Sequence, residues 1–426
     1  MLDPLAEPVY PLERAEFVRA LATGQGRAMI HVERCGAEAF EDEILDAALF
    51  PKVYDTQCNG YGEQWLARLC AMAGLVDVII FGSHGIEGGN GTLRCRLLKE
   101  FALQGHAAAR PALREMCRYD AEWNDLIARE EIVELEGEEG FIFVVEQLGE
   151  SLLADTDFRI YPSEISVLDE KCGKGTAMTI LERESPGNPW IAAYHKAVLE
   201  DQARDQKKPA PFEPTVEEVI GMILTSPTQM PRLIHCGKRA TVEERLKVAA
   251  LDFTKMSPAS LGSYLCYFRE TGFPEFREEH LELLGNTGDR ISGRARKVLS
   301  HHAEPLVRKA AYEALARGEV GSFVELLRSS GLAGDIEPVL EAISAPATLA
   351  DLDECHYIGP ALIEMMEANP AMRDLRLPMW AYQHNPCMIC REEAVKAMKE
   401  LPDFPTWVAQ ECLYDAREDI RSLVAT

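Results

Sequence analysis

Short amphipathic helices separated by brief turns recur along the chain, and this pattern limits the possible folds more than any other feature of the sequence. The segment 302–318, HAEPLVRKAAYEALARG, is the best-defined example. Glu304 and Pro305 predict a helix start, because proline at the first helical position loses no hydrogen bond. Gly318 is placed to end the helix. The intervening helix presents one apolar stripe, formed by Val307, Ala310, Ala311, Ala314 and Leu315. Three of these five residues are alanine, so a neighbouring helix can approach closely.

The same period predicts further short helices at 38–50, 63–73, 92–103 and 107–117. The apolar run FIFVV at 141–145 resembles a strand in composition, but its flanking residues favour a buried helix. Thr241 and Glu244 have the spacing of a capping box, in which each side chain satisfies a free amide at the helix start. The stripe predicted to follow this capping box is Val242, Leu246, Ala249, Ala250 and Phe253.

An arginine in the position of Arg308 recurs in several of these segments, which indicates an internal repeat. It is found as Arg245, Arg391 and Arg421, with a weaker copy at Arg110. The repeat length is roughly 30 to 40 residues and variable, as in helical solenoids. From residue 241 to the end, the chain resembles HEAT-repeat and armadillo-type proteins. The first two hundred residues share only the helical period.

This resemblance implies an all-α fold, an α-α superhelix in which helical hairpins stack as a HEAT-like solenoid. A single hairpin cannot bury its own apolar stripe, so its neighbours must cover it. The composition changes at 201–215, DQARDQKKPAPFEPT, where prolines and charges predict a linker or exposed loop. We therefore expect an N-terminal helical-repeat half at 1–200 and a C-terminal HEAT-like half at 216–426.

The chain carries 44 basic and 70 acidic residues, a formal net charge of −26. This excess argues against general binding to nucleic acid or to an anionic membrane, because phosphate groups attract positive charge. No apolar stretch has the length of a membrane-spanning helix, and the first residues lack the basic head and apolar run of a signal peptide. The twelve cysteines are scattered, unlike a dense disulfide framework. We expect a cytoplasmic protein with reduced cysteines and no cofactor.

One short motif, HNPCMIC at 384–390, invites a metal or redox hypothesis. His384, Cys387 and Cys390 form half of a zinc-site pattern, and Cys412 is a candidate fourth ligand. The simpler interpretation is that Asn385 and Pro386 open a helix and that Cys390 occupies a core position. Two glycine-rich loops, 82–91 and 171–176, are interpreted as turns between helices, because neither has the glycine spacing of a phosphate-binding loop.

A cluster of positive charge stands out in this acidic chain. Its members are Arg290, Arg294, Arg296, Lys297, Arg308 and Lys309. On a common concave face they could bind an acidic peptide or a phosphate backbone through charge-assisted hydrogen bonds. Alternatively, the arginines of the repeat pair with acids of the adjacent repeat, which we favour for Arg308, Arg391 and Arg421 because repeated residues usually serve the repeated interface.

The HEAT-like resemblance implies a non-enzymatic scaffold that binds a protein partner along its concave face. Two alternatives stay open at this point. The first is a HEAT-like enzyme, similar to DNA glycosylases or bilin lyases, that uses the basic cluster at 290–309. The second is a metal or redox sensor at Cys387 and Cys390.

Overall fold

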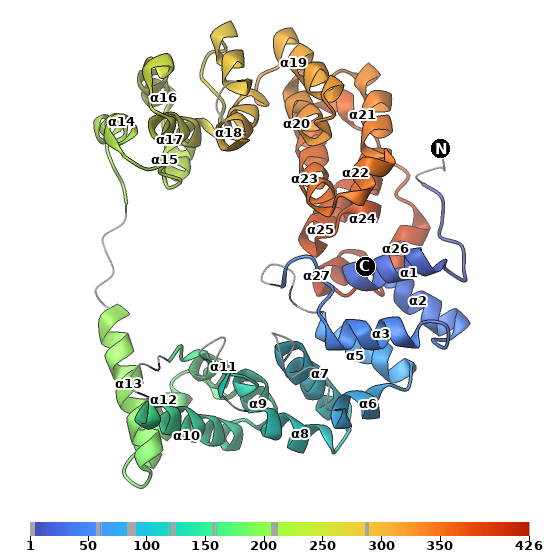
Figure 1. Cartoon of the computed structure of the whole chain (residues 1–426), viewed down its shortest axis with the longest axis vertical. Helices are drawn as coiled ribbons and strands as arrows, with labels where there is room; N and C mark the ends of the chain where they lie inside the picture. The colour runs from blue at the N-terminus through green and yellow to red at the C-terminus, as the bar shows by residue number, and fades with distance from the viewer. Residues whose placement is uncertain are drawn as a thin grey trace. The chain divides into compact units, whose positions relative to one another are not determined.

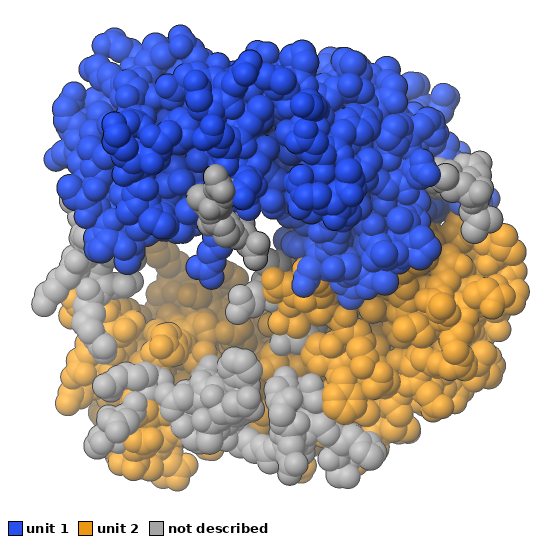
Figure 2. Space-filling view, turned by 45° about the horizontal axis from the view of Figure 1, so that its top comes forward, with its two compact units in different colours: residues 1–7, 211–408 blue, residues 8–210, 409–426 orange. Residues whose placement is uncertain are grey.

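The protein is all-α, as a computed structural model shows for residues 5–56, 60, 62–82, 91–117, 119–120, 125–155, 158, 160–205, 212–285 and 289–425 (Figure 1). It divides into two compact units, which Figure 2 colours separately. Unit 1 comprises residues 1–7 and 211–408, and unit 2 comprises residues 8–210 and 409–426. None of the described helices combines the length and apolar character needed to cross a membrane.

Unit 2 contains the N-terminal helices and the last helix of the chain. Its elements are α1 (Arg14–Thr23), α2 (Gly26–Cys35), α3 (Glu41–Leu49), α5 (Glu63–Met72), α6 (Val76–Phe81), α7 (Gly91–Leu103), α8 (Ala109–Met116), β1 (Tyr119–Asp120), β2 (Asp125–Leu126), α9 (Arg129–Glu136), α10 (Glu138–Ala154), α11 (Ser163–Cys172), α12 (Thr176–Glu184), α13 (Pro189–Asp205) and α27 (Glu418–Val424). The two strands form one short antiparallel pair. Buried apolar side chains from Leu12 to Val198 form a continuous core.

Unit 1 contains the helices of the second half of the chain. They are α14 (Val216–Thr225), α15 (Leu233–Arg239), α16 (Val242–Ala249), α17 (Pro258–Phe268), α18 (Asp289–Leu299), α19 (Pro305–Ala316), α20 (Val320–Ser330), α21 (Ile336–Ile343), α22 (Pro346–Ala350), α23 (Leu352–Ala368), α24 (Arg376–His384) and α25 (Met388–Lys399). Four 3₁₀ turns join them: η1 (Phe253–Lys255), η2 (Glu278–Leu284), η3 (Ala333–Asp335) and η4 (Pro370–Met372). Helix α26 (Thr406–Cys412) crosses the boundary between the units.

Helices that are close in sequence also pack together in each unit. In unit 1, α17, α18, α20, α23 and α25 contact one another in that order, while α19 packs on α20 and α24 packs on α25 (Figure 1). In unit 2, α5, α7, α9 and α11 form a similar succession, with α8 on α7 and α10 on α9. Each unit therefore has one row of helices in direct succession and partner helices that cover this row.

The predicted helix starts and ends are confirmed where the local signals are strongest. Pro305 is the first residue of α19, and Gly318 follows its end with a φ of 81°. The amides of Gly318 and Glu319 bond to the carbonyls of Leu315 and Ala314, which is the Schellman pattern. The FIFVV run lies in helix α10, as predicted, with Phe141 fully buried.

The stripe predicted for 242–253 is wrong for the helix itself, although Phe253, which lies beyond the end of the helix, is buried as predicted. The capping box itself is present, with the Glu244 amide 3.2 Å from the Thr241 hydroxyl. However, Val242 is 60% exposed and Leu246 is 41% exposed, whereas Val248 is fully buried. Helix α16 ends at Ala249 and packs on α14 through this other face. Helix α16 has only eight residues and buries few side chains. The spacing of its apolar residues is therefore a weak guide to which face packs against the neighbouring helix.

The segment expected to be a linker, 201–215, also differs from the prediction. Helix α13 continues to Asp205, and a second capping box between Thr215 and Glu218 begins α14. Residues 206–211 lie outside the described part of the chain. The boundary between the units falls within the expected segment, but residues 409–426 belong with the N-terminal half.

The C-terminal residues are tied to the first helices of unit 2 by backbone and buried side-chain contacts. The amide of Ala416 donates to the carbonyl of Gly24 at 2.9 Å. The indole of Trp65 donates to the carbonyl of Tyr414 at 2.7 Å. Arg27 and Glu411 form an ion pair with side chains only 4% and 2% exposed. Unit 2 is therefore completed by the end of the chain.

Candidate functional site

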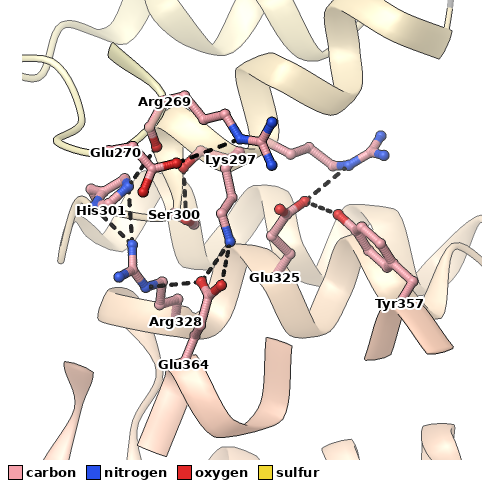
Figure 3. A network of polar contacts seen from close by, with 10 residues as sticks. Arg269, Glu270, Lys297, Ser300, His301, Glu325, Arg328, Tyr357 and Glu364 are labelled. Carbon is pink, nitrogen blue, oxygen red and sulfur yellow. Dashed lines mark hydrogen bonds and ion pairs between the residues drawn. The ribbon is translucent and has the colours of Figure 1, made fainter. Parts of the chain in front are cut away.

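A network of charged side chains joins α18, α20 and α23 of unit 1 (Figure 3). Lys297 of α18 lies 2.5 Å from Glu364 of α23, and Arg328 of α20 lies 3.5 Å from the same carboxylate. Arg296 lies 3.5 Å from Glu325 of α20. The carboxylate of Glu325 also accepts a hydrogen bond from the Tyr357 hydroxyl. Three consecutive helices of the row are thus linked by alternating charge.

Burial sets the protonation behaviour of this network. Burial raises the pKa of Glu325, although hydrogen bonding from Tyr357 and the charges of Lys297 and Arg296 oppose the shift. The pKa of His301 falls to about 4, first because it is buried and second because Arg328 is positive. Neutral His301 donates from Nε2 to the Arg269 carbonyl at 3.0 Å and accepts from Arg328 at 2.8 Å. The charged side chains of the network are thus held in place by hydrogen bonds and ion pairs with one another.

The residues of the predicted basic cluster lie on two helices. Arg290, Arg294, Arg296 and Lys297 lie on α18, and Arg308 and Lys309 lie on α19. Arg290 is exposed, Arg294 donates to Gln229, and Lys309 lies 3.7 Å from Glu313 on its own helix. Arg296, Lys297 and Arg308 each face a carboxylate on another element, so half of the cluster is neutralised within unit 1.

Arg308 makes the contact expected of an inter-repeat pair. Its guanidinium binds Asp335, which follows α20 and begins the next helix, at 2.5 and 2.8 Å. Asp335 also accepts from the Tyr312 hydroxyl at 2.5 Å. Arg391 is fully buried on α25. Arg421 instead donates to the backbone carbonyls of Asp415 and Ala416.

Asp335→Asn is expected to lower the unfolding free energy by about 1–2 kcal/mol, since a buried charge-assisted bond is lost while Arg308 stays partly hydrated. Burial alone would raise the pKa of Asp335, but hydrogen bonds from Arg308 and Tyr312 lower it overall. The pKa of Asp335 is therefore lower in the folded protein than the value of about 3.9 in the unfolded chain, so the Asp335 carboxylate stabilises the folded protein at pH values above about 3.9. The difference between wild type and variant should therefore be constant near pH 7 and shrink as the pH falls below about 4. Urea titrations at several pH values measure this, and a difference that grows in acid would contradict it.

A groove of about 840 Å³ lies beside the network in unit 1. It is lined by residues of α18, α20, α22 and α23, by the end of η2, and by the turns that precede α20 and α23. Its charged lining residues are Arg296, Glu319, Asp351 and Glu354. Arg296 is already paired with Glu325 and Glu319 with Arg317, so the remaining charge in the groove is that of Asp351 and Glu354. The ring of Tyr357, a residue 39% exposed, also lines it.

The acidic groove residues are fixed by helix ends. Asp351 caps α23 by accepting the Glu354 amide at 3.0 Å. Glu354 accepts the Gly321 amide at 2.6 Å, which joins the start of α23 to the start of α20. Glu319 pairs with Arg317 at 2.7 Å. Sequence reasoning missed these three acids because acidic residues are abundant; the capping spacing of Asp351 and Glu354 was the available signal.

A second cluster joins a histidine of α23 to the start of α25. One ligand-type atom each from His356, Cys387 and Cys390 lies within 4.8 Å of the others. Cys387 is the N-cap of α25, and Cys390 lies in its first turn. A hydrogen bond from the Cys390 thiol is the largest cause that lowers the pKa of Cys387, and the same hydrogen bond raises the pKa of Cys390. Cys387 is buried, whereas His356 and Cys390 are half-buried.

This cluster differs from the ligand set that the sequence suggested. His384 is not a member of it, and its ring lies 5.4 Å from that of Trp380. Cys412 is also not a member and is buried in unit 2. Sequence reasoning missed His356 because it lies one repeat earlier, with no local spacing to mark it.

The glycine-rich loop 171–176 forms a turn between α11 and α12, as predicted. The carboxylate of Asp169 accepts the amides of Gly175 and Ala177 at 2.7 and 2.9 Å, so the start of α12 is already bound to an anion of the chain. The other loop, 82–91, has residues 83–90 outside the described part of the structure.

Comparison with family models, curated proteins and solved structures gave no match to the chain.

Proposed function

We propose that the protein is an interaction module that binds an extended, lysine- or arginine-bearing segment of a partner protein in the groove of unit 1. The observation that carries this proposal is the acidic lining of that groove by Asp351 and Glu354. In this proposal, the stacked hairpins act as a HEAT-like scaffold that holds the groove residues on adjacent helix starts. The described cysteines are free thiols, which fits a protein of the reducing cytoplasm.

The sign of the charge on the proposed partner segment follows from the charged residues of unit 1. The basic cluster could attract an acidic peptide only if its cations were available, but Arg296, Lys297 and Arg308 are engaged by carboxylates. The groove instead offers carboxylates and the aromatic ring of Tyr357, and both kinds of group attract cationic side chains. The net charge of −26 would add long-range attraction for a basic partner and speed its association.

The proposal is tested with a double variant that removes charge and keeps hydrogen bonding. Asp351→Asn can still cap α23, and Glu354→Gln can still accept the Gly321 amide. We expect this variant to bind fluorescent lysine- and arginine-rich peptides about tenfold more weakly than wild type. Fluorescence anisotropy measures the affinity, and wild-type binding should weaken as salt is added.

The matched control is Glu313→Gln with Glu341→Gln, which removes the same charge from exposed positions outside the groove. Its peptide affinity should stay close to wild type. Equal weakening by both double variants would show that only net charge matters. Equal wild-type affinity for acidic and basic peptides would likewise reject the groove as a site for basic segments.

A further inference from the structure

The three side chains at the start of α25 have the donor set of a zinc site. Thiolate sulfur and imidazole nitrogen are the ligands that Zn²⁺ takes most often in proteins, whereas calcium and magnesium require oxygen. Among the described residues, His356, Cys387 and Cys390 are the group whose ligand atoms converge. We propose that these three residues bind one Zn²⁺ ion and that a fourth coordination position stays open.

The backbone around the three ligands is fixed by a buried asparagine. The side-chain nitrogen of Asn385 donates to the carbonyls of Cys355 and His356 at 3.2 and 3.3 Å. Its side-chain oxygen accepts the amide of Cys387 at 2.9 Å. One fully buried side chain therefore joins the histidine-bearing turn of α23 to the cysteine-bearing start of α25. Such a support outside the ligand set orients ligands and strengthens metal binding.

Gly359 makes this support possible. A Cβ atom at this position would lie 2.1 Å from the Asn385 side-chain nitrogen, so only glycine leaves space for the asparagine against α23. The helix start adds an electrostatic contribution, because the N-terminal end of α25 favours the negative charge of two thiolates. The site is thus built from a glycine, an asparagine and a helix terminus as well as its three ligands.

The number of converging ligands indicates the kind of zinc site. Closed structural sites have four protein ligands, whereas sites with three leave a position for water or an exogenous group. His356 and Cys390 are half-buried, so the cluster is not sealed in the core. A redox switch that forms a disulfide would need only Cys387 and Cys390. Here an imidazole nitrogen of His356 also lies within 4.8 Å of both sulfur atoms. The geometry therefore favours a metal site with an open coordination position over a disulfide.

The test uses the full chain, reduced with a phosphine, stripped of metal and titrated with Co²⁺ as a spectroscopic probe for Zn²⁺. We expect one ion per chain, a sulfur-to-cobalt charge-transfer band and the intense visible bands of tetrahedral cobalt, all displaced by added Zn²⁺. Cys387→Ser, Cys390→Ser and His356→Ala should each lower the affinity by about 100-fold or more. Far-ultraviolet circular dichroism checks that each variant is folded.

His384→Ala is the matched control, because this residue belongs to the same sequence motif but not to the converging group. Its Co²⁺ spectrum and affinity should equal those of wild type. The proposal is overturned if reduced wild type shows no cobalt–sulfur band, or if His384→Ala loses the metal while His356→Ala keeps it. A spectrum that azide cannot change would overturn the open fourth position. Peptide binding in the groove is a separate readout, so either proposal can fail alone.

Discussion

Arg27→Met is expected to lower the unfolding free energy of unit 2 by about 3–5 kcal/mol, because it leaves the carboxylate of Glu411 buried without its main partner. The Arg27 Nε atom lies 3.0 and 3.1 Å from the two oxygens of Glu411, and its Nη1 atom lies 3.0 Å from Glu16. Urea unfolding followed by circular dichroism and by tryptophan fluorescence measures the change. Trp65 reports on the same region through its bond to Tyr414.

Two further variants separate the buried pair from charge in general. Arg14→Met removes a 67% exposed partner of Glu43, so the loss should be about 0–1 kcal/mol. The double variant Arg27→Met with Glu411→Leu should recover much of the lost stability, because apolar residues of similar volume often replace a buried pair at little cost. If Arg27→Met costs no more than Arg14→Met, the pair contributes little to the attachment of the C-terminal helices.

The association of the chain's end with its beginning could not be predicted from the sequence. The repeat around Arg421 marks a helix, and α27 is present there. However, periodicity reports which face of a helix is apolar, not which distant helix covers it. Arg27 and Glu411 are typical surface residues by type, and only their burial in the fold makes them a pair. Local signals therefore gave the helices and most of their ends, whereas long-range packing had no local signal.

The candidate sites show the same division. Asn385 and Pro386 predict a helix start, and α25 begins two residues later, at Met388, with Cys387 as its N-cap. The residue that completes the cluster of Cys387 and Cys390, His356, depends on the packing of α23 against α25. In the basic cluster, the repeat predicted an ion pair with the adjacent repeat for Arg308 only. The contact of Lys297 on α18 with Glu364 on α23 depends on how three helices stack.

Close helix packing through glycine gives the second large expected effect. Gly237 of α15 lies against α17, and a Cβ atom there would be 1.6 Å from the carbonyl oxygen of Tyr267 and 2.7 Å from its carbonyl carbon. Backbone atoms cannot rotate away as a side chain can, so α15 and α17 would have to separate. We expect Gly237→Ala to lower the unfolding free energy by about 3 kcal/mol.

Gly221 of α14 provides the matched control, because a Cβ atom there would meet nothing within 4 Å. Gly221→Ala removes backbone freedom from the unfolded chain and should raise the unfolding free energy by about 0.5–1 kcal/mol. The change in unfolding free energy caused by the same glycine-to-alanine substitution in the same unit should thus differ in sign, depending only on whether a neighbouring helix lies against the glycine. Denaturant titration of both variants measures the difference. If both stabilise the protein, α15 and α17 can move apart freely, and the close contact at Gly237 does not fix their spacing.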